Sequence, residues 1–101
     1  MFYSQNLKHM VKYFDSQKSI KEQEYYVDTN GKIQGKGILY DRNGNVKFER
    51  IYKNNEILSE TKYYENSNVE RKYNYNGESK TFYPNNSIKQ ILYFKNGVEN
   101  A

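Results

Sequence analysis

GKGILYDRNG, residues 35–44, could be either a phosphate-binding loop or a strand that ends in a tight turn. A P-loop needs a glycine, four further residues, and then Gly-Lys-Ser/Thr leading into a helix. Here only three residues separate Gly31 from Gly35-Lys36, the next residue is Gly37, and the ILY that follows is typical of a strand. The stretch is therefore interpreted as one strand and an Asn-Gly turn, which argues against nucleotide binding.

The two close glycines have a structural interpretation of their own. Gly35 and Gly37 lie two residues apart, so they share one face of the predicted strand. Without side chains there, the strand leaves a groove into which neighbouring aromatic rings can lie. We therefore expect these glycines to make room for aromatics rather than for a ligand.

Turn signals recur along the whole chain. An aromatic residue stands before each one, at Phe14, Tyr26, Tyr40, Tyr52, Tyr64, Tyr75, Tyr83 and Phe94. Four signals contain Asn-Gly, at Asn30-Gly31, Asn43-Gly44, Asn76-Gly77 and Asn96-Gly97. Asn-Gly favours the type I′ hairpin turn, in which both residues have positive φ. A repeating series of β-hairpins is predicted.

Between the turns, side chains alternate with the two-residue period of a strand. In VKFERIY, residues 46–52, one face carries Val46, Phe48, Arg50 and Tyr52. The predicted strands are 20–27, 33–40, 46–52, 57–64, 69–75, 78–83 and 88–94. Because the connections are short, consecutive strands should pair, giving an all-β, elongated, single-layer antiparallel meander of about seven or eight strands.

The N-terminal residues 1–14 allow two interpretations. Leu7, Met10, Val11 and Phe14 have the i, i+3, i+4, i+7 spacing of a helix that would cap the open end of the sheet. The aromatic-plus-turn sequence at residues 13–15 instead favours a further strand, and we prefer this second interpretation.

Composition points to a single domain over residues 1–101 with little material for a dry core. Only 36% of the residues are apolar, and this class includes twelve tyrosines, which therefore become the expected packing material. The chain has no cysteine, no signal-like leader and no stretch that is long and apolar enough to span a bilayer, so we expect a cytoplasmic protein. Its net charge of +4 is spread along the chain and would attract anions only weakly.

NGKIQGKGILYDRNG, residues 30–44, resembles the core of a MORN repeat (membrane occupation and recognition nexus). The residues on that pattern are Gly31, Gly35, Gly37, Tyr40 and Gly44, with Tyr25 or Tyr26 as the upstream aromatic. The resemblance covers about residues 13–97, and Gly77 and Gly97 fall in later, degenerate units that have lost the Gly-x-Gly. Weak glycines with strong Tyr-x-x-Asn-Gly turns are similar to the bacterial variant repeats of YwqK-family antitoxins. The resemblance implies a hairpin sheet that binds or scaffolds through its face.

No residue pattern in the chain points to catalysis or to a cofactor. His9 is the only histidine, and neither a nucleophile nor a second metal ligand accompanies it in the sequence. We therefore expect a protein that is not an enzyme and needs no cofactor or metal.

Tyrosines interleaved with cations are the more informative pattern, because Tyr and Arg form the centres of many protein interfaces. The predicted partner-binding residues are Tyr40, Tyr52, Tyr64, Arg71, Tyr73 and Tyr75. The leading hypothesis is an antitoxin or immunity-type protein that recognises a protein partner through a Tyr-rich sheet face. The alternative is a structural or membrane-peripheral module that binds anionic lipid or its own copies. Interspersed glutamates argue against nucleic acid.

Overall fold

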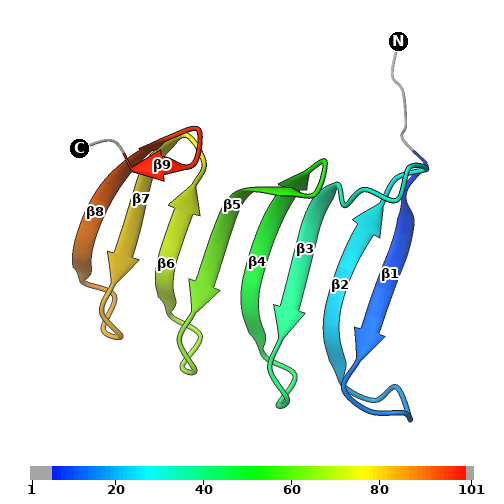
Figure 1. Cartoon of the computed structure of the whole chain (residues 1–101). Helices are drawn as coiled ribbons and strands as arrows, with labels where there is room; N and C mark the ends of the chain where they lie inside the picture. Colours follow the sequence, from blue (N-terminus) through cyan, green and yellow to red (C-terminus); the bar gives the residue numbers. More distant parts are fainter. Residues whose placement is uncertain (1–5, 100–101) are drawn as a thin grey trace.

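The computed structural model describes residues 6–99, which form one antiparallel sheet of nine strands in sequence order (Figure 1). The strands are β1 (Lys8–Tyr13), β2 (Lys21–Val27), β3 (Gly35–Tyr40), β4 (Val46–Lys53), β5 (Glu56–Tyr63), β6 (Val69–Asn74), β7 (Gly77–Phe82), β8 (Ile88–Lys95) and β9 (Val98–Glu99). The predicted meander of consecutive hairpins is therefore confirmed. The described residues contain no helix, and so none that could cross a membrane.

The predicted number of strands was wrong, and of the two N-terminal interpretations the preferred strand is confirmed over the described part. The structure has nine strands where seven or eight were expected, because Val98–Glu99 adds a short last strand. The helical alternative for the N-terminal segment fails over its described part, where β1 pairs with β2 from Lys8 to Tyr13. A short isolated helix is marginal in water, whereas a strand on the edge of β2 gains a ladder of hydrogen bonds.

Two rows of side chains define the two faces of the sheet. Cross-strand pairs connect one row through all of the first eight strands: Lys12, Gln23, Leu39, Phe48, Lys62, Arg71, Thr81 and Gln90. The next row comprises Val11, Glu24, Ile38, Glu49, Thr61, Lys72, Lys80 and Ile91. Since neighbouring residues of a strand point to opposite faces, we call the first side the groove face and the second the opposite face.

The sheet stands without a dry core. Among residues 6–99 no hydrophobic side chain is fully buried. The radius of gyration is 15.6 Å, against about 13 Å for a compact domain of this length. The accessible surface of 7442 Å² also exceeds the roughly 6,100 Å² expected for a compact monomer of 12.2 kDa. Both sides of the sheet are therefore available for contacts.

The buried positions of the described chain form a repeating series. They are Gly37, Glu60 and Ser79, and each lies on the first strand of a hairpin. Their cross-strand partners are Arg50, Tyr73 and Leu92, at the matching place on the second strand. The equivalent position is thus buried in three successive hairpins, although each hairpin has a different residue type there.

The turns differ from the type I′ prediction in most places. Of the four Asn-Gly pairs, only Asn96-Gly97 has positive φ at both residues, and Asn54-Asn55 adopts the same conformation without glycine. In the loop after β3, the carboxylate of Asp41 instead accepts hydrogen bonds from the backbone of Asn43 and Asn45. Only Gly44 has positive φ there, as in a type I turn followed by a bulge. Asp41 is therefore the residue in the sequence that indicates a loop longer than a two-residue type I′ turn.

Ser67 provides a test of this turn geometry, because it holds a φ of +69° at the place where the β3–β4 loop has Gly44. An L-residue is strained in this region, so we expect Ser67→Gly to stabilise the protein by roughly 0.5 to 1 kcal/mol. Thermal unfolding followed by circular dichroism should show a midpoint about 4 °C higher. Ser67→Ala keeps the Cβ atom and should give no gain. An equal gain in both variants would show that backbone strain is not the cause.

Candidate functional site

An open groove of about 890 Å³ lies on the groove face over β5 to β8. Its walls combine aromatic rings, such as Tyr73, Tyr75 and Phe94, with Glu60 and Arg71. A smaller hollow of about 120 Å³ lies on the same face over β2 to β4, where Tyr52 and Gly37 line it. The groove face therefore carries the main concave surface of the described chain.

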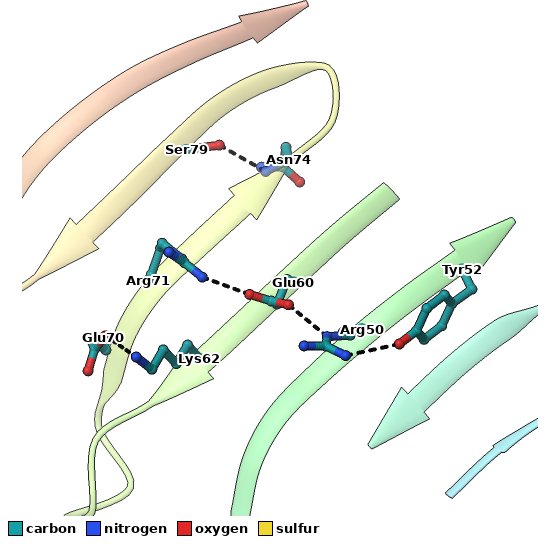
Figure 2. A network of polar contacts seen from close by, with 8 residues as sticks. All are labelled: Arg50, Tyr52, Glu60, Lys62, Glu70, Arg71, Asn74 and Ser79. Carbon is teal, nitrogen blue, oxygen red and sulfur yellow. Dashed lines mark hydrogen bonds and ion pairs between the residues drawn. The ribbon is translucent and has the colours of Figure 1, made fainter. Parts of the chain in front are cut away.

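An ionic network connects these two hollows (Figure 2). Glu60 accepts a hydrogen bond from Arg50 Nε at 2.7 Å and another from Arg71 Nη2 at 2.8 Å. The side chain of Glu60 is 10% exposed, whereas that of Arg71 is 48% exposed. Burial opposes the charge of Arg50, but its hydrogen bonds to the Tyr52 hydroxyl and to Glu60 outweigh this and raise its pKa. Arg71 is thus held in place at one end while much of its side chain stays accessible.

Glycines receive aromatic rings at two places on this face. A Cβ atom on Gly37 would lie 2.7 Å from the Tyr52 ring, and one on Gly97 would lie 2.9 Å from the Tyr75 ring. The predicted role of the glycine pair is confirmed for Gly37. It is wrong for Gly35, which has open space around it and instead supplies a positive φ of 77° where β3 begins.

Four of the six predicted partner-binding residues lie on the groove face. Arg71, Tyr73 and Tyr75 line the larger groove and Tyr52 lines the smaller hollow, and the Tyr73 ring meets Phe94 edge-on at 5.1 Å. The other two lie elsewhere. Tyr40 donates a hydrogen bond to Glu24 of the opposite-face row, and Tyr64 donates one at 2.7 Å to the carbonyl oxygen of Phe82 beside the loop after β5.

Sequence reasoning did not single out Glu60, Phe94 or Ser79 as part of this surface. Glu60 lies between Ser59 and Thr61 in the strand EILSETKY, and this local sequence does not reveal the two arginines that bind it. Its two arginines come from the strands on either side, so only the sheet register brings them together. Phe94 carried a signal, because it is one of the recurrent aromatics that precede a turn.

Cations gather around one ring next to the network. Lys47 Nζ, Arg50 Cζ and Lys62 Nζ lie 5.8, 5.0 and 5.9 Å from the centre of the Phe48 ring. Cation–π contacts of this kind are favourable by about 0.5 to 1 kcal/mol at exposed sites. Two of these cations are paired with carboxylates, Arg50 with Glu60 at 2.7 Å and Lys62 with Glu70 at 3.0 Å, so the charge around Phe48 is largely balanced.

The opposite face carries a separate network around Glu24. Its carboxylate accepts hydrogen bonds from the Tyr40 hydroxyl and from Lys21 Nζ at 3.1 Å, and it lies 2.9 Å from His9 Nε2. The Tyr40 hydrogen bond is the main cause of a lowered pKa at Glu24. Burial, together with the bond to Glu24, raises the pKa of Tyr40 to about 12. Among the residues described, no group of three or more acidic, histidine or cysteine side chains could hold a metal ion.

The first prediction for this site concerns Glu60. Glu60→Ala leaves two arginines without their shared acceptor, so we expect a loss of about 2 kcal/mol in the free energy of unfolding, measured with urea and circular dichroism. Glu70→Ala removes the more exposed pair with Lys62 and should cost less than about 1 kcal/mol. Equal losses in the two variants would contradict a central role for Glu60.

A second prediction concerns the pH dependence of Tyr40→Phe. The pKa of Glu24 in the folded protein lies below its ordinary value of 4.5. Ionised Glu24 therefore stabilises the folded state above pH 4.5, and this stabilisation is lost as the pH falls through the folded pKa. Tyr40 has a pKa raised from 10.0 to about 12, so its stabilisation is present below pH 10 and is lost as the pH rises towards 12.

We therefore expect Tyr40→Phe to destabilise the protein by about 1 to 2 kcal/mol between about pH 5 and pH 10, and by less outside that range. Urea unfolding across pH measures this difference. Tyr93→Phe, at an exposed tyrosine of the same face, should show no such dependence. A constant effect of Tyr40→Phe from pH 3 to pH 7 would refute the assignment.

Comparison with known protein families finds the MORN repeat variant, which matches residues 33–54 and 75–96. These segments coincide with the β3–β4 and β7–β8 hairpins, and the unmatched hairpin β5–β6 between them has the same architecture. A search of the curated proteins found no match to the chain. The repeat match indicates a binding or scaffold module, and the narrower resemblance to YwqK-family antitoxins stays a prediction.

Proposed function

We propose that this protein is a non-catalytic binding module that recognises a protein partner through its groove face. One observation carries the proposal: Tyr73, Tyr75 and Phe94 line an open groove beside the half-exposed Arg71. Tyrosine and arginine dominate the energetic centres of protein interfaces, and tyrosine offers much contact area for little loss of conformational entropy.

The groove is partly organised before any partner binds. Glu60 fixes the guanidinium of Arg71 at 2.8 Å, and the Tyr75 ring lies against the backbone of Gly97. Side chains that are already ordered lose less freedom on association, and this favours affinity. The groove therefore suits a partner that presents a raised, partly apolar segment.

The finer form of the proposal is an antitoxin or immunity-type role, in which the partner is a toxic protein whose working surface is covered. The resemblance to variant MORN repeats of antitoxin-labelled proteins motivates it. With a net charge of +4, this chain would block such a partner by shape rather than by imitating the charge of nucleic acid.

The test captures binding proteins from the native lysate on immobilised protein and then measures the affinity of the purified partner by calorimetry. We expect the double variant Tyr73→Ala/Tyr75→Ala to bind at least about 30-fold more weakly, because two central aromatic contacts are lost. Tyr26→Ala, on the opposite face, is the matched control and should bind within about twofold of the unmodified chain. Circular dichroism verifies that each variant is folded.

Three results would count against the proposal or its finer form. Equal loss in the double variant and the Tyr26→Ala control would exclude the groove face as the binding surface. Salt-sensitive flotation with vesicles that contain phosphatidylserine, without a protein partner, would instead support the membrane-peripheral alternative. A partner that does not arrest growth when expressed alone would exclude the antitoxin role while leaving the binding role intact.

A further inference from the structure

Within residues 6–99, the outer edge of β8 is open along most of its length. Strand β9 pairs with β8 only at Phe94 and Lys95. From Ile88 to Tyr93, β8 pairs with β7 on one side and with no described strand on the other. In contrast, β4 and β6 have a strand on both sides. An open edge presents unpaired backbone donors and acceptors that can pair with another strand.

Exposed apolar side chains accompany this edge. Ile88, Ile91 and Tyr93 on β8 and Val98 on β9 are all exposed. Natural sheets usually protect an edge with charged residues, proline or a covering loop. Strand β8 carries Lys89 and Lys95, but Ile88 and Ile91 still leave exposed apolar surface along it, which is more typical of a strand that becomes covered.

The sheet itself shows which kind of strand would cover this edge. Lys53 pairs with Glu56 and Tyr52 pairs with Ile57 where β5 begins along β4. Lys95 pairs with Val98 and Phe94 with Glu99 in the same relation where β9 begins along β8. Strand β9 thus begins along β8 in the same register in which β5 begins along β4, and the rest of the β8 edge can pair with an antiparallel strand in this register.

Strand β1 of a second copy fits the part of this edge that β9 leaves free, from Ile88 to Tyr93, with its first residue, Lys8, left outside the pairing because β9 already pairs with Phe94. It is the other edge of the sheet, at the end opposite to β8 (Figure 1), and like β5 and β7 it is an odd-numbered strand. The groove-face row begins at Lys12 and ends at Gln90, and the opposite-face row begins at Val11 and ends at Ile91. A second copy placed in the same register continues both rows.

We propose that this protein self-associates head to tail, with β1 of one copy pairing antiparallel with β8 of another. In this register Val11 faces Ile91 on the opposite face, and Met10 faces Leu92 on the groove face. Apolar cross-strand pairs of this kind stabilise sheets. Because the two surfaces differ, the contact is heterologous and adds copies head to tail, in chains or rings, rather than forming an isologous dimer. This inference does not depend on the partner proposed for the groove face.

Ile91→Lys tests the proposal, and the chain offers a close control. Ile91 and Ile51 are 42% and 43% exposed, both lie on the opposite face, and each faces a lysine on the preceding strand. Ile51 differs because β4 has strands on both sides. Sedimentation should show an average mass that rises with concentration for the unmodified chain and for Ile51→Lys. Ile91→Lys should remain a monomer.

A chain that stays monomeric up to about 1 mM would overturn the proposal, as would equal association of the two lysine variants when circular dichroism shows both folded. Cross-linking then tests the pairing, because the chain has no cysteine of its own. Mixed Val11→Cys and Ile91→Cys variants should form a disulfide between unlike copies, since cross-strand partners lie within disulfide reach. Linkage only between like copies, Ile91→Cys with Ile91→Cys, would show edge-to-edge dimers and refute the head-to-tail arrangement.

Discussion

Backbone pairing between consecutive hairpins is the interaction on which this structure depends. A single sheet has no second layer to cover either face, so the ladder between strands must hold each hairpin in place. The two unbroken rows of cross-strand partners show that the register is kept over eight strands. Tyrosines and long charged side chains suit such a sheet, because they pack along their apolar parts while their polar ends stay in water.

The residue type at one repeated position differs between hairpins and determines the local chemistry of the groove face. Gly37 leaves room for the Tyr52 ring, whereas Glu60, at the same point of the next hairpin, draws in Arg50 and Arg71. Taking these charges partly out of water carries a desolvation cost, which two short hydrogen bonds to one carboxylate offset. The network therefore acts chiefly to orient Arg71 beside the aromatic rings. The strand pairing is the same in each hairpin, while the side chains at this position change the chemistry of the surface.

The fold could be predicted from the sequence because its signals are local. Alternating side chains and turn residues located β2 to β8 closely, and the Gly37 groove followed from strand geometry alone. Contacts that depend on register could not be predicted, as the pairs of Glu60 with residues on both neighbouring strands show. The recurrent aromatics suggested one shared binding surface, and this was wrong for Tyr40. Tyr40 ends the first strand of a hairpin, whereas Tyr52 lies near the end of the second strand, and the two side chains lie on opposite faces.

The open β8 edge and the groove are neighbours, and this proximity links the two proposals physically. Gln90, Leu92 and Phe94 form one wall of the groove and belong to the strand whose edge is open. A strand added to β8 would place Met10 of the second copy beside Leu92 and so extend that wall. If association of copies changes the affinity for a groove partner, the partner must change the association of copies by the same factor. The sheet can therefore couple assembly to recognition without any change in its fold.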